Sequence, residues 1–249
     1  MLIGTRNAEP IRMTTTEFSL RQYDESYPPG IERHFWNNAR NRIIANTLSR
    51  SGMAGGFLLE IGCGTGIVLE HLQRRGMHCI GCDLAKAPVP GHLREIISTG
   101  THFRALPAET RQAVEGVLLC DVIEHIPDPG AFLLEIRAAL PNLRRVLVTV
   151  PARQELWSAW DERYGHYRRY DPDSLDADLR RGGFSPVSIR YFFHSLYAVM
   201  YLSRHRRSGT VAAPRWPLAH RLMAAAFRTE YALVPPSVPG TSLIAVADA

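Results

Sequence analysis

Short apolar segments alternate with longer segments of helical periodicity through the middle of the chain. Between the strand-like runs, residues 67–75 and 131–140 carry apolar residues at helical spacing. Strands that alternate with helices in this way are typical of a parallel sheet covered by helices on both faces. The pattern therefore predicts an α/β fold, with buried strands at 57–61, 78–82, 114–120 and 146–150.

The N-terminal part of the chain does not share this alternation. Its first thirty residues are polar and mixed, and 31–50 then show helical periodicity, with Ile31, Phe35 and Ala39 on one face. We therefore expect an N-terminal helical region over residues 1–50, ahead of a main domain over 51–249.

The C-terminal part contains two further predicted strands, at 187–193 and 242–246. They are separated by residues 194–241, although a tight hairpin would suffice to join two neighbouring strands. We therefore expect an insertion with a function of its own at 194–241.

A glycine turn follows the first predicted strand directly and precedes a helix. It reads Glu60-Ile61-Gly62-Cys63-Gly64-Thr65-Gly66, and its glycines permit a tight turn and close approach of a ligand to the backbone. Asp83 ends the next strand, where a carboxylate can accept hydrogen bonds from both ribose hydroxyls of a nucleoside. The sixth position of the dinucleotide fingerprint is Ile67 rather than glycine, which disfavours a nicotinamide oxidoreductase.

Three segments, in order, resemble class I S-adenosylmethionine (SAM)-dependent methyltransferases. Residues 58–66 resemble the first motif of this family, Gly81-Cys82-Asp83 the second, and 120–129 the segment after the fourth strand. The resemblance implies SAM as methyl donor and S-adenosylhomocysteine as product. It also implies a Rossmann-like sheet of seven mostly parallel strands, the last one antiparallel, with the third strand here at 101–104.

The same resemblance implies which residues hold the cofactor. Glu60 and the glycine turn would hold the methionine part of SAM, and Asp83 the ribose. The helix-capping alternative for Asp121 and Glu124, near Pro127, stays open. The expected cofactor-binding residues are Glu60, Gly62, Cys63, Gly64, Gly66, Asp83, Leu84, Asp121 and Val122.

One departure from the family concerns adenine. An acidic residue often follows the third strand in the family and accepts the adenine amino group. The matching stretch here, 102–107, contains none. Glu109 or backbone groups would have to replace it.

Methyl transfer to oxygen usually needs a base that takes the proton of the acceptor. His125 follows the fourth strand and His166 follows the fifth, so both are expected at the carboxyl edge of the sheet, where ligands bind. His166 is the better candidate, because its surroundings resemble methyltransferases from bacterial glycan and lipid gene clusters. Holding a loop by a hydrogen bond is the alternative role for either histidine.

Four further residues are candidates for substrate contact. Arg168 and Arg169 are suited to bind a phosphate or carboxylate, although a solvated surface role is favoured over this one. Trp160 begins the aromatic stretch that contains them. Tyr23 belongs to a segment that resembles the lid of these enzymes, in which Tyr23 or Trp36 would cover SAM.

The charge distribution and the cysteines bear on whether the protein binds nucleic acid or a metal ion. The net charge is +5, almost all the cations are arginine, and Lys86 is the only lysine. The arginines are spread along the chain, so we expect no nucleic-acid partner, although an RNA methyltransferase stays an alternative. Cys79 and Cys82 lack a second Cys/His pair and read as core residues; no metal is expected.

No secretory signal opens the chain and no run of eighteen apolar residues occurs, so a cytoplasmic protein is expected. The insertion pairs apolar stretches (196–202 and 222–227) with arginines, a composition that suits a cover over the acceptor site, a homodimer interface, or peripheral contact with an anionic membrane. We therefore expect SAM-dependent methylation of an oxygen on a small-molecule, glycan or lipid-linked acceptor. A non-catalytic SAM-binding protein is the remaining alternative.

Overall fold

A computed structural model describes residues 25, 27–205 and 214–249. The centre of the fold is a seven-stranded sheet in the order β3-β2-β1-β4-β5-β7-β6. Strands β1 to β5 pair in parallel, and β7 is antiparallel to both of its neighbours, β5 and β6. The predicted fold class is thus confirmed. The strands are β1 (Leu58–Ile61), β2 (Cys79–Asp83), β3 (Ile97–Thr99), β4 (Gly116–Cys120), β5 (Arg145–Pro151), β6 (Ser185–Phe192) and β7 (Ser242–Asp248).

The third strand does not lie where the sequence predicted it. Strand β3 is Ile97–Thr99, and the predicted strand at 101–104 is instead an irregular segment followed by the start of the 3-10 helix Phe103–Ala105. The side chain of His102 accepts a hydrogen bond from the backbone N of Arg104, which caps this short helix. Phe103 is buried because it packs into the core beside the sheet, and not because it belongs to a strand.

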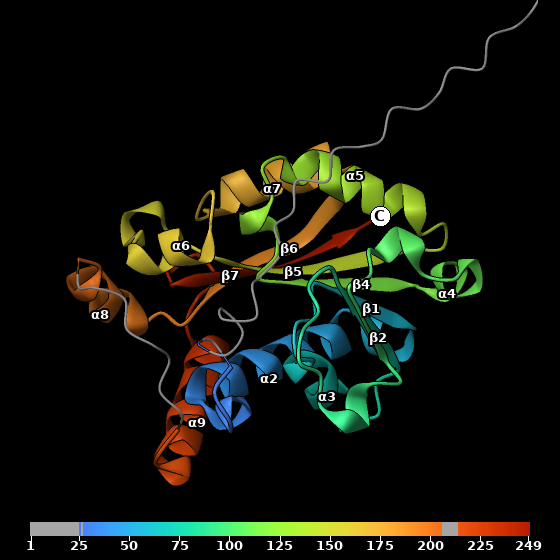
Figure 1. The fold of residues 1–249 in the computed structure, drawn as a ribbon. Helices are drawn as coiled ribbons and strands as arrows, with labels where there is room; N and C mark the ends of the chain where they lie inside the picture. The colour runs from blue at the N-terminus through green and yellow to red at the C-terminus, as the bar shows by residue number, and fades with distance from the viewer. Residues whose placement is uncertain (1–24, 26, 206–213) are drawn as a thin grey trace, which may run out of the picture.

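Helices cover both faces of the sheet (Figure 1). On one face lie α5 (Pro129–Ala139) and α7 (Pro172–Arg181). On the other lie α2 (Phe35–Arg50), α3 (Ile67–Gln73) and α9 (Pro217–Leu233). Within the described residues, the remaining helices of more than three residues are α4 (Ala108–Ala113), α6 (Ala159–Tyr164) and α8 (Leu196–Ser203).

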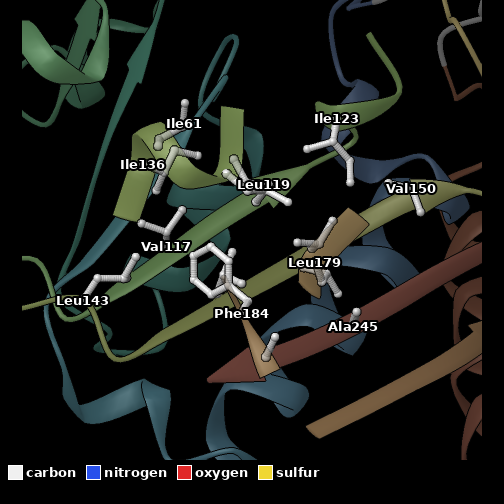
Figure 2. Close-up of a cluster of buried hydrophobic side chains, with 14 of the residues drawn as sticks. Ile61, Val117, Leu119, Ile123, Ile136, Leu143, Val150, Leu179, Phe184 and Ala245 are labelled. Atoms are coloured by element: carbon white, nitrogen blue, oxygen red, sulfur yellow. The ribbon is translucent and has the colours of Figure 1, made fainter. Parts of the chain in front are cut away.

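Successive side chains of a strand point to opposite faces of the sheet, and each face packs into its own hydrophobic cluster. Val117 and Leu119 of β4 point toward α5 and α7, where they pack with Ile136 and Leu179 (Figure 2). Leu118, between them, belongs to the opposite cluster formed with α2, α3 and α9. All four cysteines are buried and free, as expected of core residues.

The N-terminal helix and the insertion pack against each other. Phe35 of α2 stacks on Phe227 of α9, with ring centroids 5.4 Å apart, and its backbone N donates to Nδ1 of His220. Trp36 packs on Phe193, just after β6, with a centroid distance of 4.3 Å. In the parts of the chain that the structure describes, no helix is both long enough and apolar enough to cross a membrane.

Candidate active site

A cavity of about 630 Å³ opens at the carboxyl ends of the parallel strands. This edge is where ligands bind in open α/β sheets, and the volume suits a small-molecule site. Tyr23 lies outside the described residues. The cavity lining includes the sequence-predicted residues Glu60, Gly62, Cys63, Gly64, Asp83, Leu84, Asp121, Val122, His125, Trp160, His166 and Arg169.

The glycine turn is held in a conformation that requires glycine. Gly62, Gly64 and Gly66 all have positive φ, at 76°, 54° and 85°. A Cβ on Gly62 would lie 2.8 Å from Cγ2 of Val122, and one on Gly66 would lie 2.4 Å from Cδ1 of Ile97. Gly66 therefore serves the packing of the turn, and it is the one predicted cofactor residue of the turn that is not in the cavity lining.

Asp83 ties the glycine turn to the neighbouring strand. Its Oδ2 accepts a hydrogen bond from the backbone N of Gly64 at 2.7 Å, and its Oδ1 accepts one from that of Ala85 at 2.8 Å. A carboxylate has about four lone-pair sites, so it is able to accept from ribose hydroxyls in addition to backbone N–H groups. The residue both shapes the turn and faces the cavity.

Glu60 brings a buried carboxyl group to the cavity. It is the third residue of β1 and is buried, and its Oε2 has no hydrogen-bond partner among the described residues. Burial raises the pKa of Glu60 to about 8, against the opposing effect of the nearby Arg40 guanidinium. A buried acceptor without a partner is rare in folded proteins, and a cationic ligand group such as the ammonium of SAM would satisfy it.

Arg40 and Asp121 form an ion pair at the cavity wall. Asp121 has a φ of 58°, uncommon for a residue with a side chain, and Oγ1 of Thr149 donates to its Oδ1 at 3.1 Å. The helix-capping alternative is wrong for Asp121 and Glu124, because Asp128 caps α5 by accepting from the backbone N of Ala131.

Among the described residues, the segment after β3 brings no acidic side chain to the cavity. Thr101, His102 and Phe103 line it, whereas Glu109 lies on the exposed helix α4 and is not in the lining. The region after β3 therefore offers backbone groups, a hydroxyl and an aromatic wall in place of the carboxylate common in the family.

Glu124, His125 and His166 gather at the other end of the cavity. Each offers a carboxylate oxygen or ring nitrogen within 4.8 Å of the other two, and the two imidazole rings meet edge to face at 4.7 Å. The backbone N of Tyr167 donates to the backbone O of Glu124, which joins the segments after β4 and α6. Burial and the neighbouring His166 lower the pKa of His125 to about 4, whereas burial raises the pKa of Glu124 well above its usual value.

A fully buried carboxylate fixes the ring of His166. Oδ1 of Asp161 lies 2.8 Å from Nδ1 of His166 and accepts a second bond, also of 2.8 Å, from Nε of Arg169. Burial alone would raise the pKa of Asp161, but these hydrogen bonds hold it at about 2. With Asp161 ionised, the bond is one in which Nδ1–H of His166 donates to the carboxylate, so the other ring nitrogen, Nε2, points away from Asp161.

The two predicted substrate arginines have structural partners. Arg168 donates to the backbone O of Ile126 and of Pro127, and it is not in the cavity lining. Arg169 reaches the cavity, but its guanidinium also binds Asp161 and the backbone O of Ala152. The sequence interpretation missed Asp161, although the Ser158-x-x-Asp161 capping box was a local signal for it.

The fold, the glycine turn and the carboxylate after β2 define this protein as a class I SAM-dependent methyltransferase. Residues 34–189 match the methyltransferase domain family, and the chain belongs to that family. The chain is similar to the ubiquinone biosynthesis O-methyltransferase of Aeromonas salmonicida (strain A449), with 30% identity over 105 residues, which cover 39% of this chain and 44% of the relative. That of Aliivibrio fischeri (strain ATCC 700601 / ES114) is 31% identical over 96 residues, covering 36% and 40%. The match thus spans less than half the length of these relatives.

Solved structures share the fold at low sequence identity. The 1,6-didemethyltoxoflavin-N1-methyltransferase of Burkholderia thailandensis has a TM-score of 0.52 at 18% identity, covering 86% of this chain and 80% of its own. The phosphoethanolamine N-methyltransferase 2 of Haemonchus contortus has 0.53 at 16%, covering 93% and 60%. The [4+2]-cyclase SpnF also has 0.53, at 19%, covering 87% and 84%. A shared fold therefore does not define the acceptor or the reaction.

Proposed function

We propose that this enzyme transfers the methyl group of SAM to a hydroxyl oxygen of a small-molecule acceptor. The observation that carries the proposal is the Asp161–His166 pair, which presents an imidazole nitrogen to the cavity. The similarity to relatives named as O-methyltransferases supports it for the part of the chain that matches.

The cofactor would occupy the end of the cavity at β1 and β2. Glu60 would bind the ammonium group, the backbone of Gly62 and Gly64 would accommodate close approach, and Asp83 would accept from the ribose. SAM supplies a methyl group on a sulfonium centre, which is reactive without further activation. The chain therefore has to align an acceptor, exclude water and remove one proton.

His166 would remove that proton. Its Nδ1 is held by Asp161, so its Nε2 is oriented and able to accept from an acceptor hydroxyl. The carboxylate of Asp161 would stabilise the imidazolium that forms, as a positioning residue that does not itself take the proton. Trp160, Tyr164 and Met200 line the same cavity and would keep water away from the reacting atoms.

The acceptor is an apolar molecule with a hydroxyl group, and not a strongly anionic one. Aromatic and aliphatic side chains such as Trp160, Tyr164 and Met200 line this region. Arg169 is committed to Asp161, and Arg168 is committed to backbone carbonyls, so neither is available as a phosphate clamp. This argues against the anionic recognition expected from the sequence.

A lipid-linked acceptor and peripheral membrane contact are supported by the outer surface of α9. Leu218, Leu222 and Leu233 are 68%, 63% and 77% exposed, and the first two lie one turn apart. The insertion 194–241 contains six arginines and a single acid, Glu230. An exposed leucine stripe among arginines fits an anionic bilayer surface, where apolar burial and charge attraction act together.

Product analysis tests the proposed function. Purified protein is incubated with SAM and separate panels of phenols, isoprenoid-linked phenols and glycans, and both S-adenosylhomocysteine and methylated product are followed by mass spectrometry. We expect O-methylation of an apolar hydroxylated acceptor. SAM binding without turnover on any panel would favour a non-catalytic SAM-binding protein, and methylation of RNA with a steep salt dependence would favour the nucleic-acid alternative.

A further inference from the structure

Glu124, His125 and His166 form a set of metal-ligating groups that catalysis by a single base does not explain. Glu124 is completely buried, and neither of its carboxylate oxygens has a hydrogen-bond partner among the described residues. Its side chain lines the cavity together with both histidines. A buried carboxyl group whose oxygens make no hydrogen bond to the described residues carries a considerable free-energy cost, unless a ligand satisfies it.

The spacing of the three groups suits a cation. One ligand atom from each residue lies within 4.8 Å of the other two. Ligands at about 2.0–2.2 Å from a metal ion lie about 3–4 Å from one another, so the ligand atoms have to approach one another by at most about 2 Å, which side-chain rotation can supply. Among the residues that the structure describes, no other cluster of three such groups was found.

Both histidines are oriented in the manner of metal ligands. Nδ1 of His166 is hydrogen-bonded to the buried carboxylate of Asp161. His125 is hydrogen-bonded to the backbone of Tyr164 and Gly165. A ligating histidine almost always donates its other ring N–H to a carboxylate or backbone carbonyl, because this fixes the tautomer and the ring orientation.

We propose that Glu124, His125 and His166 bind a divalent transition-metal ion at the acceptor end of the cavity. Two imidazoles and one carboxylate favour Mn²⁺, Fe²⁺, Co²⁺ or Zn²⁺ over Mg²⁺ and Ca²⁺, which prefer oxygen ligands. Three protein ligands leave coordination positions open toward the cavity. No local sequence signal marks this site, because residues 124 and 125 lie about forty positions from residue 166.

The role of the ion in catalysis rests on the proposed function, whereas its binding does not. A divalent cation lowers the pKa of an oxygen that it coordinates, so an acceptor hydroxyl at an open position would lose its proton more readily. In the ion-bound enzyme Nε2 of His166 is a ligand and the cation activates the hydroxyl. In the ion-free enzyme the imidazole itself accepts the proton.

Metal titration of the full chain tests the site directly. The purified protein is stripped with a chelator and titrated with Mn²⁺, with free Mn²⁺ followed by electron paramagnetic resonance and imidazole coordination by pulsed measurements. We expect one bound ion per chain with nitrogen couplings. Glu124→Gln and His166→Ala should each weaken binding by about 100-fold or more. Circular dichroism verifies that each variant is folded.

His92→Ala provides the matched control. His92 pairs with Glu70 at 3.0 Å, also as a histidine with a carboxylate, but on the surface and outside the cavity lining. This variant should bind Mn²⁺ as the wild type does. The proposal is overturned if folded wild-type protein binds no stoichiometric ion, or if both cluster variants bind unchanged.

Cobalt distinguishes the cluster from the four buried cysteines. Co²⁺ at the proposed site should give a visible spectrum without the thiolate charge-transfer band that cysteine ligation produces, and such a band would also overturn the proposal. Methyl transfer measured with and without Mn²⁺ separates the two claims. Turnover without ion binding contradicts only the metal site, and ion binding without turnover on any acceptor contradicts only the proposed function.

Discussion

Nδ1 of His166 lies 2.8 Å from Oδ1 of Asp161, a carboxylate with no exposed surface. The same oxygen accepts from Nε of Arg169, and Asp161 Oδ2 accepts from the backbone N and hydroxyl of Ser158. One buried side chain therefore fixes the start of α6, the ring of His166 and an arginine at the cavity wall. The orientation of the imidazole is built into the loop and does not depend on a ligand.

The first prediction concerns His166. Replacement by alanine should lower kcat by about 100-fold or more, because a positioned general base contributes a factor of that order. The dissociation constant for SAM should change little, since Glu60 and Asp83 lie at the other end of the cavity. Tyr167→Phe, next in sequence and 56% exposed, is the control. Near-normal turnover of His166→Ala would eliminate it as the base.

The second prediction concerns Asp83. Asp83→Ala should weaken SAM binding by about 10- to 100-fold, because it removes a ribose acceptor and releases the backbone N of Gly64. Calorimetric titration with SAM and S-adenosylhomocysteine measures this change. The exposed Glu95, just before β3, gives the control Glu95→Ala. Equal affinities of Asp83→Ala and wild type would contradict the assignment of the ribose to Asp83.

Two glycines of similar φ separate the cost of backbone strain from that of packing. Gly66 and Gly76 have φ values of 85° and 75°, but a Cβ on Gly66 would meet Ile97 at 2.4 Å, whereas one on Gly76 meets nothing within 4 Å. Gly76→Ala should cost about 1 kcal/mol of unfolding free energy, and Gly66→Ala about 2–4 kcal/mol. Urea denaturation checks the difference. Equal losses would mean that the turn shifts to make room.

A pH effect follows from Glu60. Burial raises the pKa of this group from 4.5 to about 8, so the folded state keeps a proton that the unfolded chain releases. The stability that comes from the neutral form is therefore lost as the pH rises from about 4.5 to about 8. Glu60→Gln should flatten this decline, by on the order of a few kcal/mol at most. The free energy of unfolding is measured by urea denaturation at several pH values for wild type and variant. If it falls with pH equally in both, the raised pKa of Glu60 is refuted. Glu95→Gln is the surface control.

The last prediction concerns the leucine stripe of α9. The protein should sediment with vesicles that contain anionic phosphatidylglycerol and not with pure phosphatidylcholine, and Leu218→Ser with Leu222→Ser should reduce this binding by about 10-fold or more. Leu134→Ser, on α5 at the opposite face of the sheet and 50% exposed, is the control. A concentration-dependent dimer that the paired variant dissociates, without vesicle binding, would assign the stripe to a second copy instead.

Local sequence determined the alternating centre of the fold and the glycine turn. Sequence patterns predicted β1, the glycine turn after it and Asp83 at the end of β2. This was possible because each strand leads directly into the residues at the carboxyl edge of the sheet, where ligands bind. The third strand could not, because Ile97–Thr99 is only three residues long and is defined by pairing with β2 rather than by a pattern of its own. Short edge strands depend on their neighbours more than on propensity.

The chemistry at the acceptor end was decided by tertiary structure. The sequence supplied Glu124 and His125 side by side, but only folding brings His166 to them across the carboxyl ends of β4 and β5. Only burial leaves the Glu124 carboxyl without a hydrogen-bond partner among the described residues. Folding likewise commits Arg168 to backbone carbonyls, which no spacing rule could indicate. A sequence motif shows which functional groups lie near one another in the chain. The burial of those groups and their hydrogen-bond partners depend on residues far apart in the chain.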